Sequence, residues 1–329
     1  MVRYIGSLKK FILFSVLVMV LAGVGPASAQ GLIPDFPSFS WNPFSSQASY
    51  GGRSGASVGP LELYVGWMED RQGSSFSVNN TGSIVGGIVS FKRQFPLRGL
   101  WVGASESIKL SDNISIMASG WYLATSVTCS TETYTDLAQA ALLFMRRNWD
   151  GNNKWWFVDG LLCLGSPTGL NLLVGARYDD FTTHFKNPYD IAGISSASTD
   201  TADVTSYGVI PLIGTQWAYY GADTNLVFRA VGVPALIGSL KYNETFGATM
   251  RAEARGDYNR GYFLEFFSEY TKRFGAGQVG VFGRYNLTNG SSNVDLAVSG
   301  AGRTEYQLSL YRSSWTLGGV VTLGFNSPL

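Results

Sequence analysis

The stretch from Tyr311 to Phe325, close to the C-terminus, limits the possible folds of this chain more than any other feature. It reads YRSSWTLGGVVTLGF and alternates over its whole length. Successive side chains of an extended chain point to opposite sides, so one side is apolar between Trp315 and Phe325. The other side carries Arg312 and then small, mostly uncharged residues. About ten residues separate the aromatic ends, which is roughly the length of a tilted strand that crosses a bilayer. The stretch predicts a membrane-crossing strand.

The composition agrees with many such strands. Charged residues make up 14% of the chain, compared with about 25% in typical soluble domains, and 40 glycines accompany 14% aromatic residues. After residue 30 there is no run of about 18 apolar residues, which argues against a bundle of membrane helices. Low charge with abundant Gly and aromatic residues is typical of strands bordered by aromatic girdles.

The N-terminus predicts export. Residues 1–29 contain a basic start, an apolar run from Phe11 to Val24, and the small residues Ala27-Ser28-Ala29, as in a cleaved signal peptide. An N-terminal membrane anchor is the alternative interpretation. Cleavage removes three basic and no acidic residues, leaving 21 basic and 23 acidic residues and a net charge of −2. A nearly neutral surface gives no reason to expect nucleic-acid binding.

The rest of the chain divides into an arm and a series of strands. Residues 30–60 are rich in Ser, Pro, Gly and aromatics without a sustained period, which predicts an irregular periplasmic arm that either enters the barrel or stays mobile. Residues 61–329 form the expected barrel domain. Its ten predicted strands are 61–69, 100–110, 114–124, 153–164, 169–185, 206–220, 225–242, 261–273, 278–287 and about 306–325.

The connections between these strands alternate between short and long. Tight turns at 111–113, 165–168, 221–224 and 274–277 interleave with long polar connections at roughly 70–99, 125–152, 186–204, 243–260 and 288–305. Short periplasmic turns and long external loops are typical of a single antiparallel up-and-down transmembrane barrel, whereas a soluble propeller or sandwich needs no such alternation. Twelve strands are the alternative, with an extra pair from 82–98 or from Val294–Val298.

The signal sequence, these hairpins and the final SSWTLGGVVTLGF strand together resemble Gram-negative outer-membrane β-barrel proteins as a class. The resemblance covers about residues 60–329 and is one of architecture, not of a family motif. It implies a location in the outer membrane, contacts with outer-membrane lipid and lipopolysaccharide, and recognition by the barrel-assembly machinery. In most such barrels the last residue is aromatic, whereas here Asn326-Ser327-Pro328-Leu329 follows Phe325.

Ten charged residues are predicted to point into the lumen. Five are acids and five are arginines: Glu62, Asp159, Asp179, Glu265, Glu269, Arg177, Arg229, Arg273, Arg284 and Arg312. Arginine forms bidentate pairs with carboxylates, and a buried charge is costly unless it is paired. The balance favours a polar core that holds a narrow barrel rigid, because a ten-stranded barrel is nearly filled by its side chains. The functional alternative is a charged passage for small solutes.

The candidate for catalysis is the segment YDDFTTH, which contains the single histidine. Asp179, Asp180 and His184 are expected near the outer rim, where an acid could orient the imidazole as in omptin-type outer-membrane proteases. An acyl hydrolase is a weaker possibility, because there is no Ser two residues from His184 on either side. No metal site and no cofactor are expected, since the chain has one His and no Cys/His cluster.

Two further expectations concern single segments. Thr135–Arg147 has helical spacing and is expected to form a short surface helix at the barrel mouth, with a partner-binding helix as the alternative. Cys129 and Cys163 are expected to lie at opposite ends of neighbouring strands and not to pair. The expected function is therefore non-enzymatic: a narrow small-solute pore, or a surface-exposed structural or adhesion scaffold. The alternative is a rim-sited hydrolase centred on His184.

Overall fold

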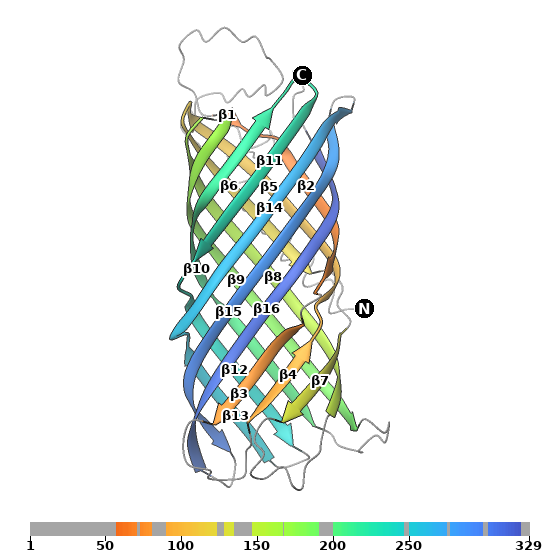
Figure 1. The fold of residues 1–329 in the computed structure, drawn as a ribbon, viewed down its shortest axis with the longest axis vertical. Coiled ribbons are helices and arrows are strands. Elements are labelled where there is room, and N and C mark those ends of the chain that lie inside the picture. Colours follow the sequence, from red (N-terminus) through yellow and green to blue (C-terminus); the bar gives the residue numbers. More distant parts are fainter. Residues whose placement is uncertain are drawn as a thin grey trace, which may run out of the picture.

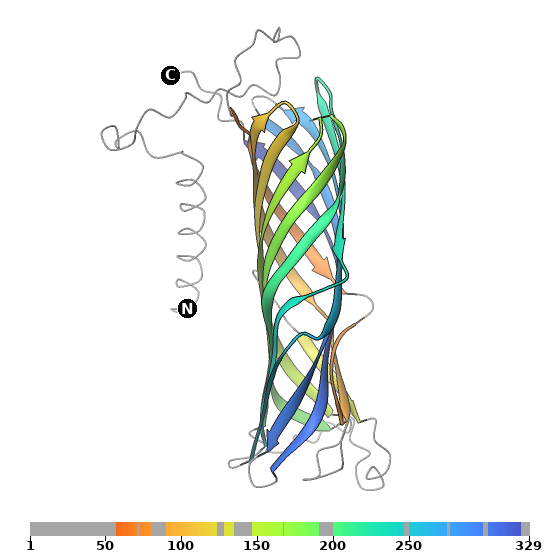
Figure 2. The same ribbon diagram turned by 90° about the vertical axis from the view of Figure 1, so that its left-hand side faces the viewer.

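The computed structural model is a tall β-barrel of tilted strands (Figure 1 and Figure 2). The structure describes the ranges 57–70, 73–80, 90–123, 128–134, 147–166, 168–190, 200–246, 250–274, 277–298 and 302–323. Among these residues no helix is long and apolar enough to cross a membrane.

Sixteen strand segments make up this part of the chain. They are β1 (Ser57–Val58), β2 (Leu61–Glu69), β3 (Ser74–Asn80), β4 (Phe91–Phe95), β5 (Arg98–Ser111), β6 (Ile114–Leu123), β7 (Thr128–Tyr134), β8 (Arg147–Leu164), β9 (Gly169–Asp190), β10 (Thr201–Tyr220), β11 (Thr224–Val233), β12 (Ile237–Phe246), β13 (Met250–Asp257), β14 (Arg260–Phe274), β15 (Gly277–Val298) and β16 (Gly302–Leu323).

The segments close into a ring of ten antiparallel strands at each end of the barrel. Near the short turns the order is β2-β5-β6-β8-β9-β10-β11-β14-β15-β16, and β16 pairs back onto β2. At the opposite end the order is β3-β4-β7-β8-β9-β10-β12-β13-β15-β16, and β16 pairs back onto β3. The predicted ten-stranded up-and-down barrel is therefore confirmed, and the alternative of twelve strands is wrong.

Five of the ten strands are interrupted once, so fifteen segments build the ten strands, and the sixteenth, β1, pairs only with β5. Pro96 separates β4 from β5 and Pro234 lies between β11 and β12; proline has no N–H to donate to a ladder. Between β2 and β3 the Asp70 carboxylate accepts the backbone N–H of Gly73 at 2.8 Å and that of Ser74. Gly73 has a φ of 72°, a conformation that glycine adopts without steric cost. The ring is closed at both ends of the barrel despite these interruptions.

The outward side chains divide the barrel into two halves. In the half next to the short turns they are apolar and exposed, as with Leu172 and Val174 on β9 and Val279 and Val281 on β15. In the other half they are polar or charged. The boundary between them carries aromatic residues: Trp67, Trp156, Tyr178, Tyr207, Tyr262 and Trp315. An apolar band with an aromatic border is the surface that a barrel presents to a bilayer.

The strands are about twice as long as a bilayer requires. β9, β15 and β16 each contain 22 residues, whereas about 9–11 tilted residues cross the hydrocarbon. The membrane-spanning half therefore continues into a second half whose outer face meets water. We call this second half the outer extension; it contains β3, β4, β7, β12 and β13, at the lower end of Figure 1.

The outer extension is where the sequence predictions were incomplete. The connections predicted at 70–99, 125–152 and 243–260 contain β3, β4, β7 and β13, and those predicted at 186–204 and 288–305 are shortened by strand residues. Val294–Val298 belongs to β15 and does not form an extra strand. The predicted helix at 135–147 lies outside the described residues except for Arg147, which begins β8. Residues 1–56, with the predicted signal peptide and most of the arm, also lie outside them.

Candidate functional site: the charged barrel interior

A cluster of five buried ion-paired side chains lies inside the membrane-spanning half. Arg177 on β9 faces Asp159 on β8, and donates from Nε to Oδ1 at 2.5 Å and from Nη2 to Oδ2 at 2.8 Å. Its Nη2 also reaches Oε2 of Glu265 on β14, at 2.6 Å. Arg284 Nη2 lies 2.5 Å from the same oxygen, and Arg229 Nη2 lies 3.4 Å from Glu265 Oε1. We call these five residues the central cluster.

Aromatic rings enclose the central cluster. The Arg177 guanidinium lies 3.9 Å from the centre of the Phe157 ring, and that of Arg284 lies 4.5 Å from the Trp121 ring. Arginine tolerates this position because its planar, weakly hydrated cation stacks on aromatic faces. The rings exclude water, so each charge depends on its partner within the barrel.

A second ion pair lies near the aromatic border. Arg312 on β16 donates from Nη2 to Asp179 Oδ2 at 2.5 Å, and Trp155 Nε1 donates to Asp179 Oδ1 at 2.8 Å. The Arg312 guanidinium also packs over the rings of Trp155 and Phe181. Asp179 is therefore held inside the barrel and does not face the outer rim beside His184.

The outer extension contains a third pair that the sequence did not indicate. Arg93 on β4 donates to Glu244 Oε1 on β12 at 2.6 Å, and both side chains are almost fully buried. The Arg93 guanidinium lies 4.4 Å from the centre of the Trp149 ring. Glu244 fell in a predicted connection, and Arg93 fell in another predicted connection for which an extra strand pair was the alternative, so neither was assigned an inward face. The periodicity Phe91, Arg93, Phe95 against Lys92 and Gln94 is the signal that could have revealed β4.

Apolar side chains fill the rest of the outer extension. The buried members of this core include Phe76, Val78, Phe91, Phe95, Phe185, Val204, Leu240, Tyr242, Val294, Leu296, Tyr306, Leu308 and Leu310. Beside them, Tyr258 shares a 2.6 Å hydrogen bond with the Ser206 hydroxyl. Burial raises the pKa of Tyr258 to about 12, although this hydrogen bond acts in the opposite direction. The interior thus changes from an ion-paired to an apolar core along the barrel axis.

A pair of acids linked by a tyrosine lies nearer the short turns. The Tyr64 hydroxyl is 2.7 Å from Glu62 Oε2 and 2.8 Å from Glu269 Oε2. Ser105 Oγ also donates to Glu62 Oε2, at 2.9 Å. Two carboxylates thus meet at one hydroxyl inside the barrel.

Nine of the ten charges predicted to face the lumen lie inside the barrel, and one does not. Arg273 is exposed at the end of β14, next to the turn, where the barrel wall no longer encloses an inward position. Arg273 thus keeps the inward register of β14, opposite the buried Gln278, but lies at the mouth of the barrel and not in its enclosed interior. Cys163 is buried inside the barrel with a free thiol; the side chain of Cys129 lies outside the described residues.

His184 lies on the outer face of the outer extension. Its Nδ1 is 2.6 Å from Asp203 Oδ1 on β10, and both side chains are a little under half exposed. Asp180 shares this outward face, whereas Asp179 points inward. The predicted trio is therefore split, and the acid that contacts the imidazole is one that the sequence did not single out. Thr182, the outward residue next to His184, has its hydroxyl 3.4 Å from that of Thr205.

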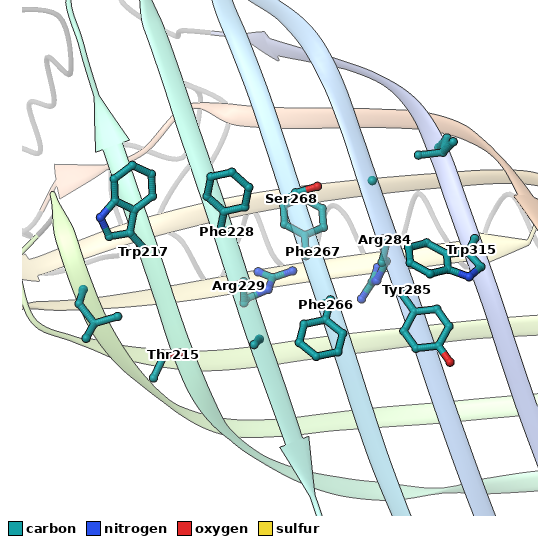
Figure 3. Close-up of a pocket in the computed structure, with 14 residues that line it drawn as sticks. Thr215, Trp217, Phe228, Arg229, Phe266, Phe267, Ser268, Arg284, Tyr285 and Trp315 are labelled. Carbon is teal, nitrogen blue, oxygen red and sulfur yellow. The ribbon is translucent and has the colours of Figure 1, made fainter.

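A shallow groove with a volume of about 400 Å³ lies on the membrane-facing surface. Figure 3 shows the outward aromatic residues around it, including Trp217, Phe228, Phe266, Tyr285 and Trp315, with Arg229 and Arg284 behind the strands. Gly283 and Ser268 leave the backbone uncovered between these rings. The groove is separated from the central cluster by the sheet itself.

Comparison with known proteins identifies a similar architecture but does not assign the chain to a family. No protein-family model matches the chain, and no curated protein matches it. Among solved structures, the outer membrane protein OprG from Pseudomonas aeruginosa matches 80% of this chain and 96% of its own, with 8% identity and a TM-score of 0.36. The translocator domain of the autotransporter NalP from Neisseria meningitidis matches 83% and 90%, with 10% identity and a TM-score of 0.28. A Pseudomonas aeruginosa FadL homologue matches 82% and 90%, with 10% identity and a TM-score of 0.26. The chain resembles outer-membrane β-barrels of Gram-negative bacteria at the level of architecture.

Proposed function

We propose that this chain is an outer-membrane scaffold: a closed barrel that holds its outer connections above the membrane for structural or adhesive contacts. The observation that carries the proposal is the filled interior. The central cluster, the Arg312–Asp179 pair and the apolar core of the outer extension follow one another along the axis. A ten-stranded barrel is narrow enough for side chains to fill, whereas open aqueous channels are found in barrels of about sixteen strands.

The length of the barrel supports the same function. An outer extension that doubles the strand length is unnecessary for a pore, because it lengthens the path of a solute. It is useful for a scaffold, because it raises the outer ends of the strands away from the lipid headgroups. Export by a cleaved signal peptide, contact with lipopolysaccharide and insertion by the barrel-assembly machinery belong to this proposal.

Single-channel recording tests the closed interior. Purified full-length protein in a planar bilayer should give no stepwise conductance, while a sixteen-stranded porin in the same bilayer should conduct. Insertion is checked separately by recovering folded barrel from the same vesicles. Reproducible conductance steps from the inserted chain would replace the scaffold with the narrow small-solute pore.

The second candidate is a hydrolase at the His184–Asp203 pair. The 2.6 Å contact favours it, because a carboxylate on Nδ1 orients an imidazole for proton transfer at Nε2. Against it, the neighbouring Thr182 and Thr205 hydroxyls contact each other. Peptide and phospholipid hydrolysis should be equal for the wild type and for His184→Ala. A loss of hydrolysis in His184→Ala, with folding intact, would favour the enzyme.

A further inference from the structure

The two short contacts of the Tyr64 hydroxyl cannot both use its own proton. A phenolic hydroxyl has one hydrogen to donate, and an ionised carboxylate has none. Oxygen atoms at 2.7 Å and 2.8 Å from the Tyr64 hydroxyl are both at hydrogen-bonding distance. If Tyr64 donates to one glutamate, the contact with the other needs a proton on that glutamate. The geometry therefore requires one of the two glutamates to be protonated while the other is ionised.

The balance of acidic and basic side chains in the same region independently indicates one extra proton. Four acids point into the membrane-spanning interior near the central cluster: Glu269, Asp159 and Glu265 are buried, and Glu62 is half-buried. The buried arginines there are three: Arg177, Arg229 and Arg284. Arg312–Asp179 and Arg93–Glu244 are each balanced within the pair. The excess is one negative charge, which one proton would neutralise, and an uncompensated buried charge is costly.

The surroundings of the two glutamates are polar but add little positive charge. Among the described residues, the groups that face them from neighbouring strands are Ser105 and Lys109 on β5, Cys163 on β8, Tyr220 on β10, Arg229 on β11, Gln278 on β15 and Thr322 on β16. Lys109 is engaged with Asp112 at the turn, with Nζ and Oδ1 2.7 Å apart, and Arg229 is engaged with Glu265. Thr322 lies directly opposite Glu62, and its buried Oγ1 has no hydrogen-bond partner among the described residues. This oxygen is available to accept a carboxylic-acid proton.

We infer that Glu62 and Glu269 form a proton-binding site that holds one proton between them through Tyr64. The site makes the end of the barrel near the short turns sensitive to pH. In the unfolded chain both glutamates are ionised at neutral pH, since an ordinary glutamate titrates near about 4.3. The folded barrel then binds one proton more than the unfolded chain, so its stability falls as the pH rises. For a single proton the folding equilibrium constant changes about tenfold per pH unit while the difference persists.

Infrared spectroscopy of the full-length protein in lipid vesicles tests the proton directly. At neutral pH the wild type should show the carbonyl band of a buried carboxylic acid, and this band should be lost in both Glu62→Gln and Glu269→Gln. Glu253→Gln, which changes an exposed acid on the outer face of β13, is the matched control and should keep the band. Absence of the band from the wild type would overturn the inference, as would its persistence in both inner variants.

Urea unfolding in the same vesicles tests the consequence. Between about pH 5.5 and about pH 7, the wild type and Glu253→Gln should lose stability with a slope close to one proton, while Glu269→Gln should lose this part of the slope. The series is repeated with a chelator and with added Ca²⁺ or Mg²⁺. Equal slopes for the wild type and Glu269→Gln would contradict the inference. So would a wild-type stability that followed the divalent cation instead of the pH, because the two glutamates would then hold a metal ion.

Discussion

Single ion pairs in this barrel differ in their energetic role because their surroundings differ. Arg98 and Glu69 lie 3.4 Å apart on the outer surface, with side chains 56% and 42% exposed. A pair of this kind contributes about 0–1 kcal/mol, since water solvates each charge nearly as well as the partner does. Arg177 and Asp159 are buried among aromatic rings, where water cannot replace a lost partner. An ion pair of the same residue types thus contributes little to stability at the surface, whereas in the interior its loss would be strongly destabilising.

Replacing Arg177 measures this difference. Arg177→Met should lower the free energy of unfolding by about 3–5 kcal/mol, because Asp159 loses its bidentate partner and remains buried. Arg98→Met is the matched control and should change it by about 0–1 kcal/mol. Urea unfolding in vesicles gives both values. Similar losses for the two variants would mean that water reaches the central cluster.

At the scale of whole strands, the sequence was informative wherever a strand meets lipid. The bounds predicted for β2 are those observed, and the predicted outward face of β16, with Trp315, Leu317 and Val321, is the exposed face. The lipid demands an apolar outer face, which alternation in the sequence reveals directly. In the outer extension the polarity reverses. β4 has Phe91 and Phe95 inside and Lys92 outside, as in a soluble sheet. The expected pattern of a lipid-facing strand is therefore missing, and the sequence placed a strand here only in the alternative with an extra pair at 82–98.

The interior was only partly predictable for a different reason. Alternation assigns a side chain to the inner face, which sufficed for Arg177, Glu265 and Arg284. It does not say which inward residues meet across the lumen. Tyr64 and Glu269 are 205 residues apart, and Arg93 and Glu244 are 151 apart. These contacts depend on ring closure and on the stagger between strands, which no local pattern encodes.

A series of arginine substitutions along β16 tests the depth of the bilayer on one strand. Gln307, Leu317 and Leu323 all point outward: Gln307 in the outer extension, Leu317 in the middle of the apolar band, and Leu323 at its end. Leu317→Arg should cost about 2–4 kcal/mol, whereas Leu323→Arg and Gln307→Arg should each cost about 0–1 kcal/mol. Unfolding in vesicles and the yield of assembled protein measure the series. A largest loss at Gln307 would mean that the outer extension lies in the lipid.

At the scale of the whole molecule, the outer surface of one barrel faces lipid in one half and water in the other, and its polarity differs between the two halves. In the lipid-facing half, buried ion pairs lie inside beside buried apolar side chains and the outer face is apolar, while the outer extension has a mainly apolar core and a polar surface. β8, β9, β10, β15 and β16 run through both halves without interruption. Each of the other five strands is built from two segments, one in each half, and a proline lies at two of the five breaks. Because the five uninterrupted strands keep their hydrogen bonding across the boundary between the halves, the outer extension stands on a rigid base.

Cysteine accessibility on β15 tests this division on intact cells. Asn293 and Val281 lie on the same strand and the same outward face, twelve positions apart, and both are exposed in the isolated barrel. In a background with Cys129→Ser and Cys163→Ser, Asn293→Cys should react with a membrane-impermeant maleimide, because it projects beyond the outer leaflet. Val281→Cys should react only after detergent removes the lipid, since a maleimide requires a hydrated thiol. If Asn293→Cys reacted only after the cells were broken, the extension would face the periplasm and could not serve as a surface scaffold.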